Sequence, residues 1–366
     1  MGFTCGIVGL PNVGKSTLFN ALTQTAAAAT SNYPFCTIEP NVGRVAVPDP
    51  RLRQIADHGK SPVIIPTQIE FTDIAGLVRG ASRGEGLGNQ FLGHIREVDA
   101  VAHVVRCFAA GGVTHVEGEV DPVRDVEIIE TELMLADLES LERRADATAK
   151  RAQAGDDHAV KTMPVMRAAL EALRDGRPAR QAEIAAGDEG RLERLQLLTT
   201  KPVLYVSNVD EESAAGGNEW SERVAALAAE EGAGHVVVSA AIEAELAQLP
   251  DEEERREFLA SLGLEEPGLH RFIRAGYDLL DLITFFTSGP KENRAWTVHR
   301  GATAPQAGGI IHSDFERGFI TAETIKLEDF VTCGGEQGAK AAGKMRQEGR
   351  DYVVRDGDII LFRFNV

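Results

Sequence analysis

The chain has 366 residues, of which 43% are hydrophobic and 26% are charged, which is typical of a globular protein with room for two or three domains. Its formal net charge of −18 argues against non-specific binding to nucleic acid or acidic membrane, and leaves docking on RNA through a local basic patch open. Four separated cysteines without a C-x-x-C pair argue against a metal-thiolate site or disulfide framework. With no apolar run of spanning length and no leader, we expect a cytoplasmic protein without membrane or sequence-specific DNA partners.

The first motif along the chain is a phosphate-binding loop. Residues 9–17, Gly-Leu-Pro-Asn-Val-Gly-Lys-Ser-Thr, match the pattern G-x-x-x-x-G-K-[ST] between a strand-like run, Phe3–Val8, and a predicted helix, Ser16–Thr23. The two glycines allow successive backbone N–H groups to point at one anion, and the helix start adds its positive dipole end. We expect Lys15 to reach the β- and γ-phosphates and the Ser16 hydroxyl to ligate Mg²⁺. The motif predicts binding of a nucleoside triphosphate.

A second acidic motif follows the predicted strand Ile64–Thr72. In Asp73-Ile74-Ala75-Gly76, the aspartate can hold Mg²⁺ through water, and Gly76 lets a backbone N–H approach the γ-phosphate. Thr37 lies between the two motifs and is better placed than Thr25 or Thr30 to supply a second hydroxyl to Mg²⁺.

The residue after this motif bears on hydrolysis. Leu77 occupies the position where Ras-like proteins place the glutamine that orients the attacking water, and a leucine has neither donor nor acceptor. Hydrolysis is then either slow or assisted by another group, for which His115 in a glycine-rich stretch is the candidate, because a neutral imidazole can position water. The other polar candidates are Arg79, Arg83 and His94.

Base recognition is predicted at the end of the strand Pro202–Ser207. Guanine-specific switch proteins carry N-K-x-D there, whereas this chain reads Asn208-Val209-Asp210-Glu211. The lysine is replaced by Val209, and Glu211 displaces the acceptor by one methylene, which weakens the match to guanine and favours adenine. Asp210 is off by one position and should face elsewhere. Ser239, at the end of the strand-like run His235–Ser239, suits the loop that closes over the base.

Strands spaced by helices through this region indicate an α/β fold with a doubly wound, mostly parallel sheet. We assign residues 1–280 to this nucleotide-binding domain, interrupted at about 122–200 by a projecting helical arm. Alternating steps of four and three in the arm are typical of a coiled-coil seam, with a turn at Gly155-Asp156-Asp157 and a returning helix beginning within Val165–Leu173. The seam residues are Met134, Leu138, Leu141, Ala145, Thr148 and Ala152. The other predicted elements here are strands at Asn41–Val47 and Ala100–Cys107 and a helix at Asn89–Val98.

Residues 281–366 have the pattern of a small α+β module. Helices are expected at Thr303–Gly308 and Glu323–Val331. The positive stretch of Lys340, Lys344 and Arg346 is either an RNA contact or a solvated loop. The expected strands are Leu282–Thr287, Arg294–Val298, Gly318–Thr321 and Ile359–Phe364.

The motifs taken together resemble the Obg-like ATPases, also called the YchF family. The stretches that carry the resemblance are Gly9–Thr17, Asn32–Pro40, Asp73–Gly80, Gly84–Leu92 and Asn208–Glu211. The resemblance covers essentially the whole chain. It implies an Obg-type nucleotide domain, a coiled-coil arm and a C-terminal TGS domain with a ubiquitin-like fold. It further implies hydrolysis of ATP in preference to GTP, and association with ribosomes.

Carried over by position, the resemblance assigns roles to individual residues. Phosphate binding falls to Asn12, Val13, Gly14, Lys15, Ser16 and Thr17. The Mg²⁺ ligands are Ser16 and Thr37, the backbone around Val209 contacts the base, and His115 matches the catalytic loop histidine. Asn12 raises the further hypothesis of a K⁺ ion beside the phosphates.

Three functional hypotheses follow. The leading one is a cytoplasmic, monomeric, Mg²⁺-dependent ATPase that acts as a slow molecular switch. The second is a GTPase in which Glu211 still accepts hydrogen bonds from guanine. The third is a binding module whose arm and C-terminal domain dock on a ribosome or protein, with hydrolysis timing release.

Overall fold

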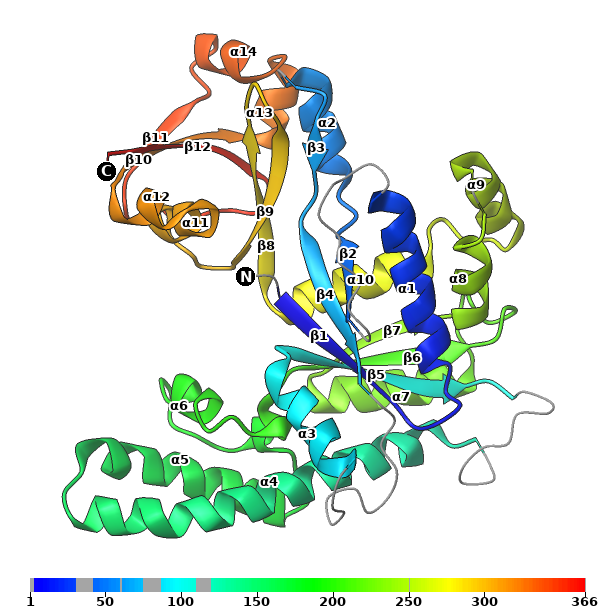
Figure 1. The fold of residues 1–366 in the computed structure, drawn as a ribbon, viewed down its shortest axis with the longest axis vertical. Coiled ribbons are helices and arrows are strands. Elements are labelled where there is room, and N and C mark those ends of the chain that lie inside the picture. The colour runs from blue at the N-terminus through cyan, green and yellow to red at the C-terminus, as the bar shows by residue number, and fades with distance from the viewer. Residues whose placement is uncertain are drawn as a thin grey trace.

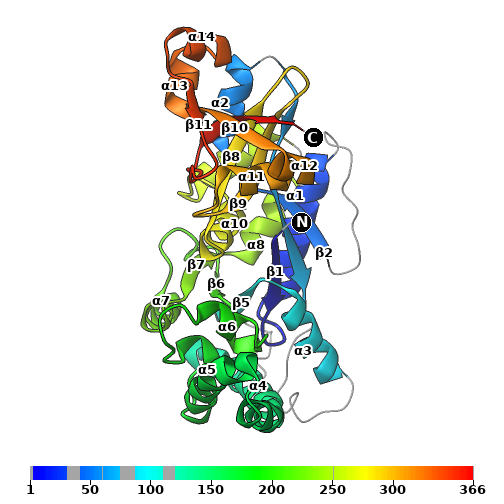
Figure 2. The ribbon, with the colours of Figure 1, turned by 90° about the vertical axis from the view of Figure 1, so that its left-hand side faces the viewer.

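The structure, a computed structural model, describes residues 3–30, 42–59, 61–74, 87–109, 120–249 and 251–365. The described chain forms two six-stranded sheets and a pair of long helices that projects from the first sheet (Figure 1). In the perpendicular view the helical arm and the second sheet lie at opposite ends of an elongated molecule, with the first sheet between them (Figure 2). In these described ranges no helix has the length and apolarity needed to cross a membrane.

The first sheet has the strand order β2-β4-β1-β5-β6-β7. Every neighbouring pair is parallel except β2 with β4, which is antiparallel. This confirms the predicted α/β fold with a mostly parallel, doubly wound sheet. The strands are β1 (Phe3–Val8), β2 (Val42–Ala46), β4 (Gln68–Asp73), β5 (Ala100–Cys107), β6 (Val203–Val209) and β7 (Gly234–Val238).

Helices cover both faces of this sheet because residues along its central strands are apolar on both sides. On β6, Leu204 and Val206 belong to an apolar cluster that includes residues of α1 (Lys15–Thr30) and α10 (Gly268–Leu279). Tyr205 belongs to another cluster, which includes residues of α4 (Pro122–Gln153) and α7 (Glu219–Glu231). Buried parallel strands are expected to show this continuous apolar character. The remaining helices of this part are α3 (Leu87–Glu97), α7 (Glu219–Glu231), α8 (Ala240–Leu246) and α9 (Glu252–Ser261).

The arm consists of α4 (Pro122–Gln153) and α5 (Asp157–Arg174), followed by the short helix α6 (Glu189–Glu193) and the 3₁₀ turns η2 (Ala179–Gln181) and η3 (Leu198–Thr200). All but one of the predicted seam residues pack in its apolar cluster, Thr148 being the exception. The returning helix begins earlier than Val165, because the Asp156 side chain caps it by accepting a hydrogen bond from Ala159 N at 3.0 Å.

The second sheet has the order β11-β10-β12-β8-β9-β3. The predicted helix Glu323–Val331 is wrong in its first half, since Glu323 to Lys326 continue β10 and pair with β12, and Glu323 and Thr324 also pair with β11. Cross-strand pairing therefore overrides the local preference of this segment. The strands are β8 (Leu282–Ser288), β9 (Asn293–His299), β10 (Phe319–Lys326), β11 (Arg346–Glu348) and β12 (Asp358–Phe364); the helices are α11 (Ala304–Ile311), α12 (Ser313–Arg317), α13 (Leu327–Thr332) and α14 (Glu336–Ala341).

A segment from the first half of the chain completes the second sheet. The run Ile64–Thr72 is two strands, because Pro66 lacks an N–H and ends β3 (Ile64–Ile65), which pairs with β9 rather than with the first sheet. Helix α2 (Pro50–His58) packs beside it, and Leu52 and Ile55 share a core with Phe286 and Phe330. The predicted domain boundary at residue 281 therefore leaves α2 and β3 out of the unit with which they pack.

Candidate nucleotide-binding site

The predicted site residues converge at one edge of the first sheet. The phosphate loop follows β1, Asp73 ends β4, Val209 ends β6 and Ser239 follows β7. Because these strands are parallel, their carboxyl ends meet at the same edge, which is where open α/β sheets bind ligands.

The phosphate loop is shaped by close backbone approaches. Gly14 has a φ of 91°, and a Cβ there would lie 2.1 Å from Asn208 Nδ2. A Cβ on Gly9 would lie 2.7 Å from the carbonyl oxygen of Val104. Asn12 also has a positive φ, of 64°, so two residues of the loop, separated by Val13, adopt the left-handed conformations that are found in anion-binding loops.

Asn208 fixes this loop from the neighbouring strand. Its Nδ2 donates to the Val13 carbonyl at 2.8 Å, and its Oδ1 accepts from Ala240 N at 2.9 Å. The side chain is 4% exposed. The Asn208 side chain therefore links the phosphate loop to the loop after β7, and its contact with the nucleotide stays a prediction. The bond to Ala240 was not anticipated from sequence.

The predicted cation and the predicted magnesium carboxylate lie together. Lys15 Nζ forms an ion pair with Asp73 Oδ1, and both side chains are largely buried, at 11% and 16% exposure. Ser16 and Thr17 are exposed at the start of α1. The loop cation and the carboxylate thus lie in contact, and the residue that follows Lys15 carries the hydroxyl that a metal–triphosphate site requires.

This donor set fits Mg²⁺. The structure contains no group of three or more His, Cys, Asp or Glu side chains suited to a metal in its described ranges. Mg²⁺ is a hard ion that is commonly held by one or two protein oxygens together with substrate phosphates and water. Ser16 and Asp73 supply that kind of incomplete oxygen set.

The loop after β6 shows how the Asn208–Glu211 motif is arranged. Val209 is 3% exposed and packs in the apolar cluster with Val105 and Tyr205. The Asp210 carboxylate accepts from Ser213 N at 3.0 Å and so faces its own turn, as predicted. Glu211 is exposed, with no hydrogen bond or ion pair from its carboxylate within the described chain.

Ser239 and Glu243 lie on the other side of this edge. Ser239 is 3% exposed, and its hydroxyl is buried without a hydrogen-bond partner among the described residues. Glu243, one turn into α8, accepts from Gly268 N at 2.7 Å and so joins α8 to α10. Burial raises the pKa of Glu243 to about 7, against the smaller opposing effect of its backbone hydrogen bonds.

Several predicted residues lie outside the described ranges. These are Thr37, Gly76, Leu77, Arg79, Arg83 and His115. His94, the remaining polar candidate for hydrolysis, is exposed on α3.

A buried ionic cluster, not anticipated from sequence, joins the arm to the sheet. Arg180 Nη2 lies 2.5 Å from Glu130 Oε1 and 2.9 Å from Glu231 Oε2, and the Tyr205 hydroxyl donates to Glu231 at 2.7 Å. Burial lowers the pKa of the adjacent His103 to about 3, with a further contribution from Arg180, so this imidazole is neutral. The cluster ties η2 and α4 to β6 and α7.

Comparison with known proteins identifies the family. A family model described as "50S ribosome-binding GTPase" matches residues 4–138, and the model YchF-GTPase_C, described as "Protein of unknown function (DUF933)", matches residues 282–365. The protein "Ribosome-binding ATPase YchF" of Escherichia coli O157:H7 is 56% identical over 366 residues, which is 100% of both chains. This chain belongs to the YchF family.

Other YchF proteins agree with this assignment. The Bacillus subtilis (strain 168) protein of the same name is 53% identical over 368 residues and is also covered in full. The solved "Structure of the Schizosaccharomyces pombe YchF GTPase" is 36% identical and superposes with a TM-score of 0.88, over 99% of this chain and 98% of that one. The YchF fold therefore extends over both sheets and the arm.

Proposed function

We propose that this chain is a Mg²⁺-dependent ATPase that hydrolyses ATP to ADP and phosphate and associates with ribosomes as a slow molecular switch. The observation that carries the proposal is a phosphate loop with its cation in place beside a base loop that lacks the lysine and aspartate of guanine-specific proteins. The names of the bacterial relatives, which call them ribosome-binding ATPases, support it.

The residue roles belong to this proposal. The backbone of Asn12 to Thr17 binds the phosphates, and Lys15 neutralises charge on the β- and γ-phosphates. Ser16, Asp73 and Thr37 hold Mg²⁺, which when bound neutralises charge on the phosphate oxygens. Gly76 approaches the γ-phosphate and His115 positions the attacking water.

Adenine preference rests on the loop after β6. The Val209 side chain is buried in the core and offers no cation to a base, while Asp210 is engaged by its own turn. Glu211 is the remaining carboxylate of the motif, and its extra methylene misplaces the pair of acceptor oxygens that guanine needs. We propose that the backbone around Val209 and the Ser239 loop contact the adenine.

Competition binding tests this proposal. Labelled ATP bound to the full chain with Mg²⁺ should be displaced by unlabelled ATP at lower concentration than by GTP. Glu211→Asp restores the shorter carboxylate at an exposed position. It should narrow the difference between the concentrations of ATP and GTP that displace the labelled ATP. A wild-type preference for GTP would reject the adenine assignment and support the GTPase alternative, which the name of the Schizosaccharomyces pombe relative favours.

The nucleotide-gated binding module remains a second candidate, because the Arg180 cluster joins the arm to the strand that carries the base loop. Ribosome co-sedimentation with ATP and with ADP tests it, and equal recovery in both would reject coupling between nucleotide and docking. The K⁺ hypothesis for Asn12 is tested by turnover in sodium and potassium buffers, where equal rates would remove it.

A further inference from the structure

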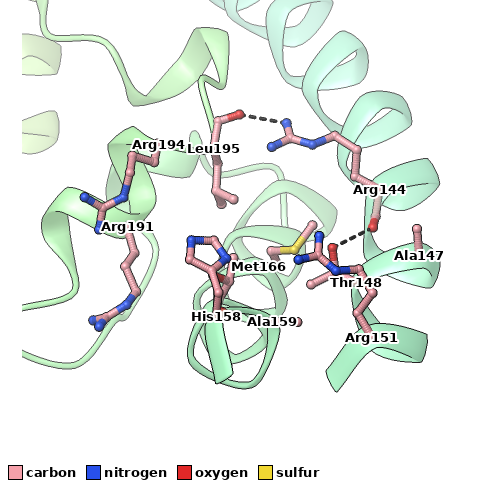
Figure 3. A pocket seen from close by; sticks show the side chains of 11 residues that line it. Arg144, Ala147, Thr148, Arg151, His158, Ala159, Met166, Arg191, Arg194 and Leu195 are labelled. Carbon is pink, nitrogen blue, oxygen red and sulfur yellow. Dashed lines mark hydrogen bonds between the residues drawn. The ribbon is translucent and has the colours of Figure 1, made fainter. Parts of the chain in front are cut away.

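A pocket on the helical arm is lined by basic side chains from three segments. It has a volume of about 320 Å³ and lies between the end of α4, the start of α5 and the α6 region. We call it the arm pocket; the side chains used below are Arg144, Arg151, His158, Met166, Arg191 and Arg194. Figure 3 shows Arg144 and Arg151 reaching from α4 toward His158 and Met166, while Arg191 and Arg194 lie on the opposite side with their side chains extending away from these residues.

These guanidinium groups keep much of their hydrogen-bonding capacity. Arg144 donates one bond, from Nη1 to the Leu195 carbonyl at 2.7 Å. Arg151 pairs with Asp156 at 2.5 Å, and Arg191 pairs with Asp188. The Arg194 side chain makes no hydrogen bond or ion pair within the described ranges. Since each guanidinium carries five donor N–H groups, donors remain on these side chains that no described protein group accepts from.

In two other pockets of the described chain, carboxylates line the site together with the arginines. In the pocket beside α2, Arg51 is held by Asp49 and Asp356, and Arg300 by Asp281. In the small pocket on α5, Arg174 pairs with Glu142, and Glu171 and Asp175 also line the site. Among these three pockets, the arm pocket is the one whose lining contains no carboxylate, in a chain whose net charge is −18.

We propose that the arm pocket binds a small phosphate-bearing molecule of the nucleotide class. Guanidinium groups bind phosphate through paired N–H donors, and Arg144 and Arg194, which have no ion pair within the described ranges, can neutralise phosphate charge. Met166 and Ala159 are buried beneath the opening and give the organic part of the ligand an apolar floor. The volume falls at the small end of the range of ligand pockets, roughly 300–1,000 Å³.

The surrounding charges favour a small ligand over an RNA strand. Asp146 on α4, Asp157 on α5, and Glu189 and Glu193 on α6 are exposed carboxylates of the same segments. An extended polyanion that filled the pocket would also run past these carboxylates, whereas a mono- or dinucleotide-sized ligand would not.

The site is independent of the proposed ATPase centre, so the two can be tested separately. Equilibrium dialysis of the full chain against radiolabelled ADP, with Mg²⁺ and up to about 1 mM nucleotide, measures bound ADP per chain. We expect two ADP per chain for the wild type and one for Arg144→Gln/Arg194→Gln, with unchanged ATP turnover. Lys15→Ala should lose the other molecule and keep the one in the arm pocket.

The matched control is Arg167→Gln/Arg174→Gln, which removes two arginines from the α5 pocket of the same arm and should retain both molecules. Arg194→Gln alone breaks no described contact, guards against misfolding of the double variant, and should weaken the second site at least about fivefold.

Wild-type binding of one ADP that depends on Lys15 and not on Arg194 would overturn the proposal. So would a short single-stranded RNA that binds in an Arg194-dependent manner while ADP does not. If ADP binding depends on Arg194 and is unaffected by Lys15→Ala, the arm pocket stands and the ATPase proposal falls.

Discussion

Replacing Asn208 with alanine tests whether one buried amide holds the nucleotide edge together. The side chain makes two hydrogen bonds, to the Val13 carbonyl at 2.8 Å and from Ala240 N at 2.9 Å. Both backbone groups are close to the Asn208 amide in the buried region under Gly14. Asn208→Ala therefore leaves a buried acceptor and a buried donor unpaired, and each such group costs about 1–3 kcal/mol.

We expect Asn208→Ala to lower the free energy of unfolding by about 2–6 kcal/mol, less any part recovered by water entering the space of the amide. Affinity for ATP should fall as well, because the loop that carries Gly14 loses its anchor. Urea unfolding followed by circular dichroism measures the first effect, and ATP titration measures the second.

Two further variants make this test specific. Asn20→Ala changes an exposed asparagine on α1 and should alter stability by less than about 0.5 kcal/mol. Asn208→Asp keeps an acceptor for Ala240 N but brings a carboxylate oxygen to the Val13 carbonyl, so it should also be destabilising. If Asn208→Ala unfolds at the wild-type urea concentration and binds ATP normally, the proposed anchoring role is refuted.

Four other single substitutions probe the described contacts. Lys15→Ala should weaken ATP binding by about 2–3 kcal/mol in a titration, since a charged donor to the phosphates is lost, and Asp73→Asn should raise the Mg²⁺ concentration for half-maximal turnover roughly tenfold. Arg180→Met leaves Glu130 and Glu231 as buried carboxylates without their cation and should cost about 3–5 kcal/mol in urea unfolding, partly restored by changing both glutamates to glutamine. Burial raises the pKa of Glu243 from 4.5 to about 7, so the folded protein binds this proton more tightly than the unfolded chain does. The resulting stabilisation is fully present below pH 4.5 and is lost as the pH rises through about 7. Glu243→Gln should remove this slope, worth about 3 kcal/mol, as checked by unfolding at about pH 5 and about pH 8.

Sequence patterns predicted the central elements well, because their environment is uniform. All residues of β5 are buried, and its bounds, Ala100–Cys107, are those expected from the apolar run. In strands near the edge of a sheet, pairing with strands distant in sequence decides the secondary structure. Glu323 to Lys326 read as helix formers, yet β12 and β11 hold them as strand, and neither partner is visible from the local sequence.

In the candidate site as well, features formed by contiguous residues could be predicted, and contacts between residues far apart in sequence could not. The phosphate loop was predictable because its glycines, lysine and serine are contiguous and each has a local role. The Asn208 bonds join residues 195 and 32 positions apart, and the Arg180–Glu130 pair spans 50 positions, so no local pattern predicts them. The roles of Thr37 and His115 stay predictions, since these residues lie outside the described ranges.

The segment between β2 and β4 links the candidate site to the second sheet. Both strands belong to the first sheet, and β4 ends at Asp73, but the connection between them carries α2 and β3 into the other unit. There Asn293 Nδ2 donates to the Ser61 carbonyl at 2.6 Å, and Asn293 N donates to the Val63 carbonyl at 2.8 Å. Leu52 and Ile55 are almost fully buried against the same unit. Because this connection is both hydrogen-bonded and buried there, α2 and β3 are fixed parts of the second unit, and only Pro66 and Thr67 separate β3 from the strand that ends at Asp73.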